Sequence, residues 1–404
     1  MKFILVKEFI QMLTFDFTYL FFNAVLLFTF FYYGRKIAKG ANYWKNALVC
    51  IMVYVFVLGA RYGRGNDYFH YLSVYKVGLG YEQVLFEWIN DFLKWMGVGA
   101  HYIFFYYAFV FIVCAMIFLK PYRKYMAYML PIFLIATLQL EEYQIRQALS
   151  YSFVFLYTWK LVEKNSKRKT IFGMNARHIW LALFFLLATA IHIANSLIIV
   201  VITFFYLFLH RLIPLYVSIP VYLVAVYVLS TYADLSFLEK ILSFLSRQNE
   251  RFAQYVERSD IWFSSEGYKT KYVRQNIVMV FEALGNISLF YFSAKTIKKA
   301  CNEKWAILMT NMYIFGTIFR QAFIRLELMN RMGNNMMLFF FVPLSIVLYY
   351  YKKMKYNFFE KVCFVFLIFW VYDYLKMMLM RDVEKMLFLW DYSTYQYFEN
   401  VYDL

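Results

Sequence analysis

The chain has 404 residues, of which 63% are hydrophobic, 24% aromatic and only 17% charged. This apolar content exceeds what the core of a water-soluble protein can bury and leaves little room for a soluble domain, so lipid must solvate much of the surface. The net charge of +17 would suit a nucleic-acid partner, but the charges lie in short loops between apolar runs, a pattern that instead sets membrane orientation and argues against nucleic acid.

Apolar runs bounded by charge recur along the chain and predict about twelve membrane spans, since about 17 to 25 residues cross the hydrocarbon layer. The N-terminal stretch MKFILVKEFIQML is interrupted by charge and lacks a small-residue cleavage site, which argues against a removed signal peptide. The first apolar run is therefore predicted to serve as an uncleaved insertion signal. The predicted fold is an all-α, polytopic integral membrane protein. Residues 1–404 form a single domain in this prediction, because no repeat or low-complexity linker divides them. The predicted spans are 17–33, 46–60, 101–119, 126–141, 148–162, 179–193, 195–209, 215–231, 275–293, 305–319, 335–350 and 362–379.

The loops between these runs differ in charge. One alternate set, which includes GRKIAKGANYWK, KPYRKY, AKTIKKACNEK and YKKMKYNFFEK, is rich in lysine and nearly free of acids, so it is predicted to face the cytoplasm. The other set comprises the N-terminus, 61–100, the turn near 142–147, 232–274, 320–334 and the tail from 381, and it is predicted to face outward. It balances its basic residues with acids and uses mostly arginine, whose planar fork binds phosphate or carboxylate through two hydrogen bonds. The outer face is therefore predicted to bind a large anionic ligand, although any one arginine could simply pair with a neighbouring acid. These arginines are Arg61, Arg64, Arg146, Arg247, Arg251, Arg258, Arg274, Arg320, Arg325, Arg331 and Arg381.

The first polar segment at an outer span end is RYGRGNDYFHY, which follows the span at 46–60. Polar groups in such places are costly to bury unless they are paired or functional. The glycines permit tight turns, and Arg61, Asp67 and Tyr68 are candidates for hydrogen bonds to a sugar or a phosphate. The alternative is a solvated, turn-forming loop.

The second polar segment, LEEYQIRQALS, joins the fourth and fifth predicted spans. On a continuous helix Glu142 and Arg146 would lie four residues apart on one face, so an ordinary salt bridge is the alternative to a functional role. Gln147 extends the polar patch into a span that is otherwise apolar and aromatic. Arg146 and Gln147 are therefore candidate site residues.

The third segment, ATAIHIANS, places His192 near the end of a span, with Asn195 and Ser196 after it. Histidine can act as a base, or donate to a phosphate when protonated. The alternative is a hydrogen-bonded core histidine. Neither this histidine nor the four cysteines show metal-ligand or CxxC spacing, so the sequence predicts no metal site and no disulfide.

The fourth segment, FRQAFIRLELMNRMGNN, carries Arg320, Arg325 and Arg331 among apolar residues. This pattern suits an amphipathic segment at the membrane interface, and a simple snorkelling anchor is the alternative. The long outer loop at 232–274 alternates basic with aromatic residues, the combination that phosphate pairing and sugar stacking require together. It is predicted to be a lid.

In this order and spacing, the segments RYGRGNDYFHY, YEQVLFEWIN, IRQALS, AIHIANS and NRMGNN resemble the EpsG-like branch of the Wzy-type polysaccharide polymerases. The resemblance covers nearly the whole chain, and the ordered set is more specific than any one motif. Two positions depart from the family pattern. Asn66 stands where threonine is usual, and Gln83 follows Glu82 where proline is usual.

The resemblance implies a glycosyltransferase that polymerises undecaprenyl-pyrophosphate-linked repeat units on the outer face of the bacterial inner membrane, for O-antigen, capsule or exopolysaccharide. It implies that Arg146 and Arg331, supported by Arg325, bind the pyrophosphate and stabilise it as the leaving group. It implies His192 or Asp67 as the base that takes the proton of the acceptor hydroxyl. Glu82 joins Arg61, Tyr68 and Gln147 as a substrate-binding candidate. The implied partners are the lipid-linked oligosaccharide, membrane lipids and a chain-length regulator. No cofactor or metal is expected, because the arginines would replace a cation.

Two other functions are compatible with the sequence. A polyprenyl-phosphate-dependent membrane glycosyltransferase would add one sugar, and Asp67 in the first outer loop is compatible with it. A transporter of lipid-linked oligosaccharide would also need a basic cavity, but it should show paired halves and charged groups near the midplane. The polar residues of this chain gather instead at outer span ends.

Overall fold

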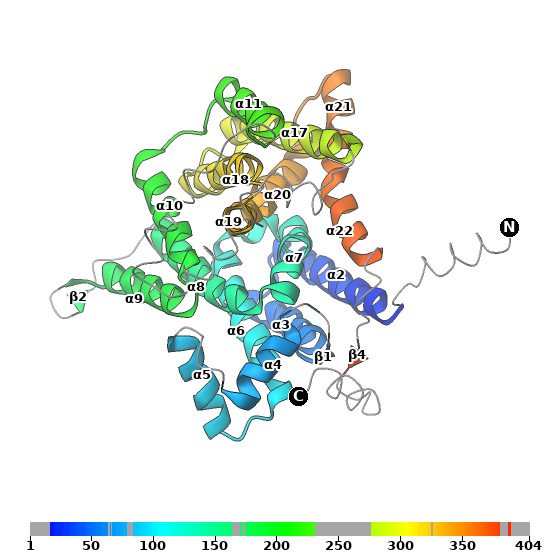
Figure 1. Cartoon of the computed structure of the whole chain (residues 1–404). Helices are drawn as coiled ribbons and strands as arrows, with labels where there is room; N and C mark the ends of the chain where they lie inside the picture. Colours follow the sequence, from blue (N-terminus) through cyan, green and yellow to red (C-terminus); the bar gives the residue numbers. More distant parts are fainter. Residues whose placement is uncertain are drawn as a thin grey trace, which may run out of the picture. The chain divides into compact units, whose positions relative to one another are not determined.

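The structure, a computed structural model shown in Figure 1, is built almost entirely of helices. It describes residues 17–63, 65, 67–78, 84–163, 170–171, 174–230, 276–324, 326–379 and 387–388. The predicted lid at 232–274 and the candidate residues Glu82 and Arg325 lie outside the described residues.

The all-α prediction is confirmed for the described part of the chain. The helices are α2 (Phe17–Ala38), α3 (Tyr43–Gly59), α4 (Tyr68–Val77), α5 (Val84–Trp95), α6 (Ile103–Leu119), α7 (Met126–Tyr143), α8 (Ile145–Val162), α9 (Ala176–Ile191), α10 (Ala194–Phe208), α11 (Leu215–Val224), α17 (Asn276–Ala300), α18 (Lys304–Ala322), α19 (Glu327–Met337), α20 (Phe341–Tyr350), α21 (Phe358–Val365) and α22 (Phe369–Leu379). Short helical turns extend or join them at Ala100–Tyr102, Lys120–Tyr125, Ala225–Leu229, Leu338–Phe340, Tyr351–Lys353 and Phe366–Ile368.

Four two-residue strands accompany the helices. They form two antiparallel pairs, β1 (Arg61–Tyr62) with β4 (Leu387–Phe388) and β2 (Thr170–Ile171) with β3 (Met174–Asn175). The first pair joins the beginning of the RYGRGNDY segment to the C-terminal tail. Both of these segments were predicted to lie on the outer side.

Each predicted span overlaps a helix. By length and composition, two helical stretches of the described chain could cross a membrane: Ala100–Tyr143, which bends at Tyr122, and Met329–Lys353. Four shorter apolar helices accompany them, at Tyr43–Gly59, Ala176–Ile191, Ala194–Phe208 and Leu215–Leu229. The number of about twelve crossings stays a prediction.

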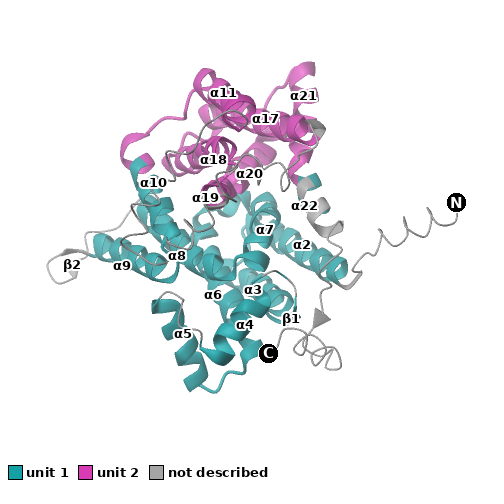
Figure 2. Ribbon diagram, viewed as in Figure 1, with its two compact units in different colours: residues 1–204, 371–404 teal, residues 205–370 magenta. Residues whose placement is uncertain are grey.

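The chain divides into two compact units, coloured separately in Figure 2. Unit 1 comprises residues 1–204 and 371–404, and unit 2 comprises residues 205–370. The prediction that residues 1–404 form a single domain stays a prediction.

Aromatic packing fixes the centre of unit 1. Phe111 of α6, Phe133 of α7 and Phe155 of α8 are all fully buried. Their ring centroids lie 5.8–6.2 Å apart, within the range of favourable aromatic pairs. This cluster holds α8, the helix that carries Arg146, firmly against two neighbours.

Unit 2 is organised around α17, which packs against α11, α18 and α20. A buried polar chain joins three of these helices. Asn286 of α17 donates to the hydroxyl of Tyr222 in α11, at 3.0 Å, and accepts from the hydroxyl of Tyr313 in α18, at 2.7 Å. Because such groups are costly to bury without partners, these bonds specify how the helices align.

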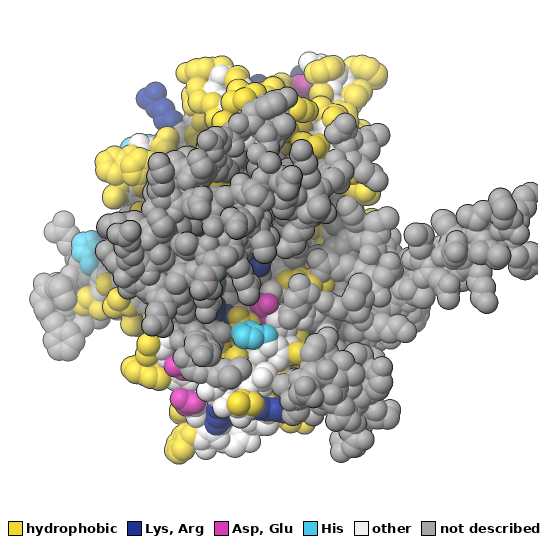
Figure 3. All heavy atoms as spheres, viewed as in Figure 1, with side chains coloured by type: hydrophobic (Ala, Val, Ile, Leu, Met, Phe, Trp, Pro, Cys, Tyr) yellow, Lys and Arg dark blue, Asp and Glu magenta, His cyan; other side chains and the backbone are white. Residues whose placement is uncertain are grey.

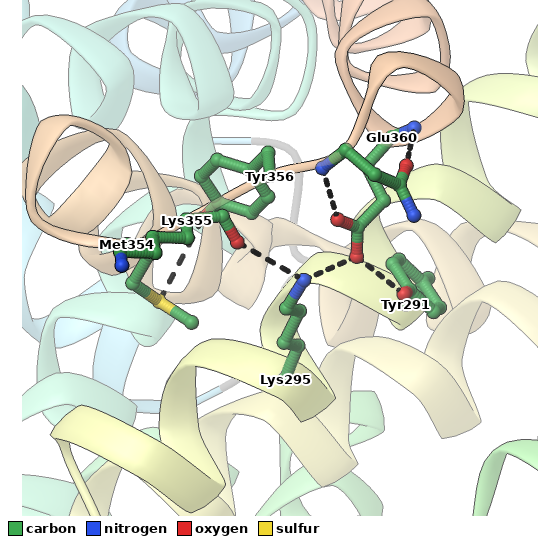
Figure 4. A network of polar contacts seen from close by, with 7 residues as sticks. Tyr291, Lys295, Met354, Lys355, Tyr356 and Glu360 are labelled. Carbon is green, nitrogen blue, oxygen red and sulfur yellow. Dashed lines mark hydrogen bonds and ion pairs between the residues drawn. The ribbon is translucent and has the colours of Figure 1, made fainter.

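Loops predicted to be cytoplasmic contact one another within each unit. In unit 1 the ammonium group of Lys120 lies 5.2 Å from the ring centre of Trp44. In unit 2, Lys295 in the C-terminal half of α17 forms an ion pair with Glu360 and donates to the carbonyl oxygen of Lys355 at 3.4 Å. Figure 4 shows this contact network. The contacts support the predicted grouping of loops.

Glu360 is the centre of that network (Figure 4). Its carboxylate accepts hydrogen bonds from Lys295, from the hydroxyl of Tyr291 at 2.6 Å and from the backbone N–H of Asn357 at 2.9 Å. These donors, Lys295 first, lower the pKa of Glu360 to about 2. In return, the Asn357 side chain accepts from the backbone N–H of Glu360 at 2.8 Å, which completes a capping box at the start of α21.

The lowered pKa predicts a pH-dependent contribution to stability. The pKa of a glutamate in an unfolded chain is about 4.3. Above that pH the ionised Glu360 therefore stabilises the fold, and this contribution is lost as the pH falls toward 2. We expect wild-type protein in detergent to have a higher unfolding temperature than Glu360→Gln at pH 7, and the difference to shrink between pH 5 and pH 2. A difference that is independent of pH would show that this network does not stabilise the fold through charge.

Candidate functional site

The junction between α7 and α8 is the centre of the candidate site in unit 1. The helix axis is interrupted at Gln144, whose φ of −140° and ψ of 52° are not helical. Arg146 and Gln147 consequently lie in the first turn of α8, which contains no acidic residue. Helix N-termini attract anions through their free N–H groups and dipole, and Arg146 adds a full positive charge there. The residue is partly exposed, while the Nε and Nη1 atoms of its guanidinium are buried.

This break corrects one premise of the sequence analysis. Glu142 and Arg146 do not share a face of one continuous helix, because Gln144 separates α7 from α8. Glu142 is fully buried and accepts a hydrogen bond from the hydroxyl of Tyr19 in α2 at 2.8 Å. The acid therefore helps to attach α7 to α2.

The RYGRGNDY segment packs directly on this junction. The Nη2 atom of Arg61 donates to the carbonyl oxygen of Glu141 at 2.8 Å, in the last turn of α7. Gly65 lies so close to the carbonyl of Glu142 that a Cβ atom there would overlap it. Gly65 also has a φ of +98°, a conformation that residues with a side chain rarely adopt. Glycine is therefore required at position 65, both by the positive φ angle and by the lack of room for a Cβ atom.

Arg61 and Tyr68 are interior residues. Arg61 is 2% exposed, and its carbonyl partner is part of α7. Tyr68 is fully buried, with its ring stacked on that of Phe104 at 4.1 Å. Their burial favours a role in positioning the loop over the direct ligand contact that the sequence predicts. Asp67, at the N-cap position of α4, is partly exposed and makes no capping hydrogen bond with its side chain.

The third polar segment packs against α8. Asn195, at the start of α10, is buried and donates to the Oγ atom of Ser150 at 2.8 Å and to the carbonyl of Gln147 at 3.3 Å. Ser150 in turn donates to the carbonyl of Ala188 in α9 at 2.7 Å. These bonds fix the break between α9 and α10, where His192 lies.

His192 is half-buried, one residue beyond the end of α9. Its Nδ1 atom accepts from the backbone N–H of Ala194 at 3.3 Å. A neutral imidazole that accepts at Nδ1 carries its proton on Nε2. This arrangement favours a hydrogen-bond donor to an anion over a general base acting through Nε2.

The structure therefore brings the RYGRGNDY segment and the AIHIANS segment together at the α7–α8 junction. Arg61 binds the last turn of α7, and Asn195 binds the first turn of α8. Sequence reasoning missed Glu141, which is 2% exposed beside Arg61. The available signal was an acid at the end of a predicted span, but the sequence shows the same signal at the neighbouring Glu142.

The fourth polar segment belongs to unit 2, and most of it is helical. Helices α18 and α19 form a hairpin in which Gly316 lies against Met336 and Gly333 lies against the backbone of Arg320. The sequence predicts an amphipathic segment that lies at the membrane interface, whereas the structure shows two closely packed antiparallel helices at this place. Arg331 is exposed on α19.

Arg320 is held by an acid that the sequence analysis did not consider. Its Nη1 atom forms an ion pair with Glu282 of α17, and the side chain of Gln321 donates to the same oxygen at 2.8 Å. Glu282 is 4% exposed. The sequence did contain a signal for this pair, because Glu282 is an acid within the predicted span 275–293, and an acid inside a span needs a partner.

Removing this buried charge is expected to destabilise unit 2. Glu282→Gln keeps the shape but loses charge-assisted hydrogen bonds, which are worth about 1–3 kcal/mol. We expect a lower unfolding temperature in detergent. The double variant with Arg320→Gln should lose less than the sum of the two single changes. Strict additivity would show that the ion pair contributes nothing to stability.

Over the ranges that the structure covers, no group of three or more His, Cys, Asp or Glu side chains could hold a metal ion. Cys50, Cys114 and Cys301 are buried, and Cys363 is half-buried; all four are free thiols.

Much of the described surface is apolar. Figure 3 shows hydrophobic side chains over α11, α17 and α21, and Tyr216, Phe358 and Phe359 are each more than 70% exposed. Surfaces of this kind are unfavourable in water and favourable in lipid. The helical fold, the apolar surface and the lysine-rich loops together define an α-helical membrane protein.

Comparison with known families gives a second, independent line of evidence. The EpsG family model matches residues 44–394, and the chain therefore belongs to the EpsG family. Membership indicates a glycosyltransferase-type role in polysaccharide biosynthesis. No curated protein and no solved structure matches the chain.

Proposed function

We propose that this protein polymerises polysaccharide repeat units on the outer face of the bacterial inner membrane. A growing glycan would pass from undecaprenyl pyrophosphate to an incoming lipid-linked repeat unit. The observation that carries the proposal is that the RYGRGNDY and AIHIANS segments both bind the α7–α8 junction, where Arg146 lies in the first turn of α8. Family membership supports the reaction class.

The proposed reaction is a glycosyl transfer. A hydroxyl oxygen of the incoming unit bonds to the anomeric carbon of the growing chain, the bond from that carbon to the pyrophosphate oxygen breaks, and the hydroxyl proton passes to a base. Negative charge develops on the leaving pyrophosphate, so fixed positive charge there lowers the barrier. Arg146 and the N-terminus of α8 are suited to that task.

The other site residues take supporting roles in this proposal. His192 donates from Nε2 to an anionic oxygen, as its Nδ1 contact favours. Asp67 is the candidate base, since it is partly exposed and adjoins the packed loop. Gln147 is 5% exposed and shapes the first turn of α8. Arg331 and Arg325 are assigned to the pyrophosphate by the resemblance alone.

The proposed topology has about twelve crossings, with lysine-rich loops inside and arginine-rich segments outside. Its support comes from contacts within each unit. Segments predicted to lie outside bind one another, as Arg61 does with Glu141, and loops predicted to lie inside do the same, as Lys295 does with Glu360.

Gel analysis of polysaccharide from a deletion strain tests the proposal in cells. We expect a single repeat unit attached to the lipid carrier or acceptor and no ladder, with the ladder restored by the wild-type gene. Loss of one sugar from the repeat unit would indicate a single-sugar glycosyltransferase. Lipid-linked units that accumulate on the cytoplasmic side would indicate a transporter.

A further inference from the structure

Helix α5 presents three different faces along its 12 residues. One face is buried in unit 1: Phe86, Asn90 and Leu93 are each at most 4% exposed. Phe86 and Leu93 join the hydrophobic cluster that also contains Tyr107, and Asn90 accepts from the Tyr107 hydroxyl. The position of α5 on unit 1 is therefore fixed by side-chain packing and by a buried hydrogen bond.

The second face is polar and lies along one edge of the helix. It contains Glu87, Asp91 and Lys94, at three- and four-residue spacing. Lys94 forms an ion pair with Asp91 at 3.8 Å, and its ammonium group lies 5.3 Å from the ring centre of Tyr75. Charged side chains are costly to bury, and all three are at least partly exposed, so this face of the helix is suited to contact with water.

The third face is an outward apolar stripe. Val84, Trp88, Phe92 and Trp95 are 59%, 66%, 54% and 80% exposed, and their spacing places them on one side of the helix. Four large apolar side chains in a row, two of them tryptophan, would be unfavourable in water. Tryptophan is enriched at the level of lipid headgroups.

The surroundings of α5 identify what covers this stripe. Helix α5 packs against α9, whose Trp180, Leu183 and Leu186 are also exposed. At about 1.5 Å per residue α5 is about 18 Å long, too short to cross about 30 Å of hydrocarbon. A helix with one protein-facing side, one water-facing edge and one apolar stripe is suited to lie flat in a membrane interface.

We propose that α5 is an interfacial helix, with Val84, Trp88, Phe92 and Trp95 inserted into the lipid and Glu87, Asp91 and Lys94 facing water. Helix α5 would then be a membrane-bound part of unit 1 rather than an element in solution. Helix α4, which begins beside Asp67, precedes α5 and would be held at the same membrane surface.

Spin labels at single positions test this proposal in the full-length protein. The background carries Cys363→Ser, because the other three cysteines are buried. Cysteine is introduced at Trp88 or Phe92 on the stripe, and at Asp91 or Lys94 on the polar edge as matched controls on the same helix. The protein is placed in vesicles of phosphatidylethanolamine and phosphatidylglycerol, and collisions of the label with oxygen and with a water-soluble nickel complex are measured.

We expect the ratio of oxygen to nickel collisions to shift toward oxygen at positions 88 and 92 and toward nickel at positions 91 and 94. Nickel access at all four positions would overturn the proposal, because the stripe would then face water. Labels at 88 and 92 that are immobilised and shielded from both reagents would also overturn it, since a protein partner or a second copy would cover the stripe. If a stripe variant fails to assemble, labels at Val84 and Trp95 provide the same test.

Discussion

Replacing Arg146 by alanine is expected to reduce polymer formation by at least about 100-fold, because losing one preorganised donor to developing charge has about that effect. Arg146 lies in the first turn of α8, where its charge adds to that of the helix N-terminus. The measurement is polymer yield and length in a complemented deletion strain, with the amount of membrane-inserted protein determined in parallel.

Two variants make this experiment specific. Arg146→Lys keeps the charge but loses the planar fork, so we expect an intermediate yield. Arg123→Lys is the matched control, since Arg123 is an exposed arginine in a loop predicted to be cytoplasmic, and full activity is expected. Normal polymer from Arg146→Ala at normal protein levels would remove Arg146 from the mechanism.

Replacing Gly65 by alanine is expected to destabilise unit 1 by about 3 kcal/mol or more, through a left-handed backbone and overlap with Glu142. Gly65 has a φ of +98° and faces the Glu142 carbonyl. We expect little folded protein in the membrane, and early aggregation on heating in detergent. The loop that carries Asp67 would lose its fixed position on α7.

Gly78→Ala separates the two causes. Gly78 also has a positive φ, of +72°, but nothing lies within 4 Å of the position where a Cβ would stand. The alanine there should cost only the backbone part, about 1–2 kcal/mol. Equal losses from Gly65→Ala and Gly78→Ala would show that the contact with Glu142 has no effect on stability.

The helices were predictable because each long apolar run has a strong compositional signal that needs no tertiary information. The grouping of loops by charge was also predictable, and contacts such as that of Lys120 with Trp44 agree with it. Helices α4 and α5 were not predicted, because their apolar residues are interrupted by charged and polar ones and form no long apolar run.

The details of the candidate site depend on contacts between residues far apart in the sequence, which a pattern of residue types along the chain does not predict. The interruption at Gln144 is a single residue without glycine or proline, so the sequence suggested that Glu142 and Arg146 share a face. The burial of Arg61 arises from packing on a carbonyl 80 residues away. The partners of Glu282 in the structure, Arg320 and Gln321, lie 38 and 39 residues further along the chain.

The most direct test of the central claim uses purified protein in vesicles supplied with a lipid-linked repeat unit. The account predicts a ladder of lipid-linked oligomers that differ by one repeat unit, formed by wild-type protein and lost in Arg146→Ala. Addition of a single sugar, or no elongation by protein that is folded and correctly inserted, would contradict it.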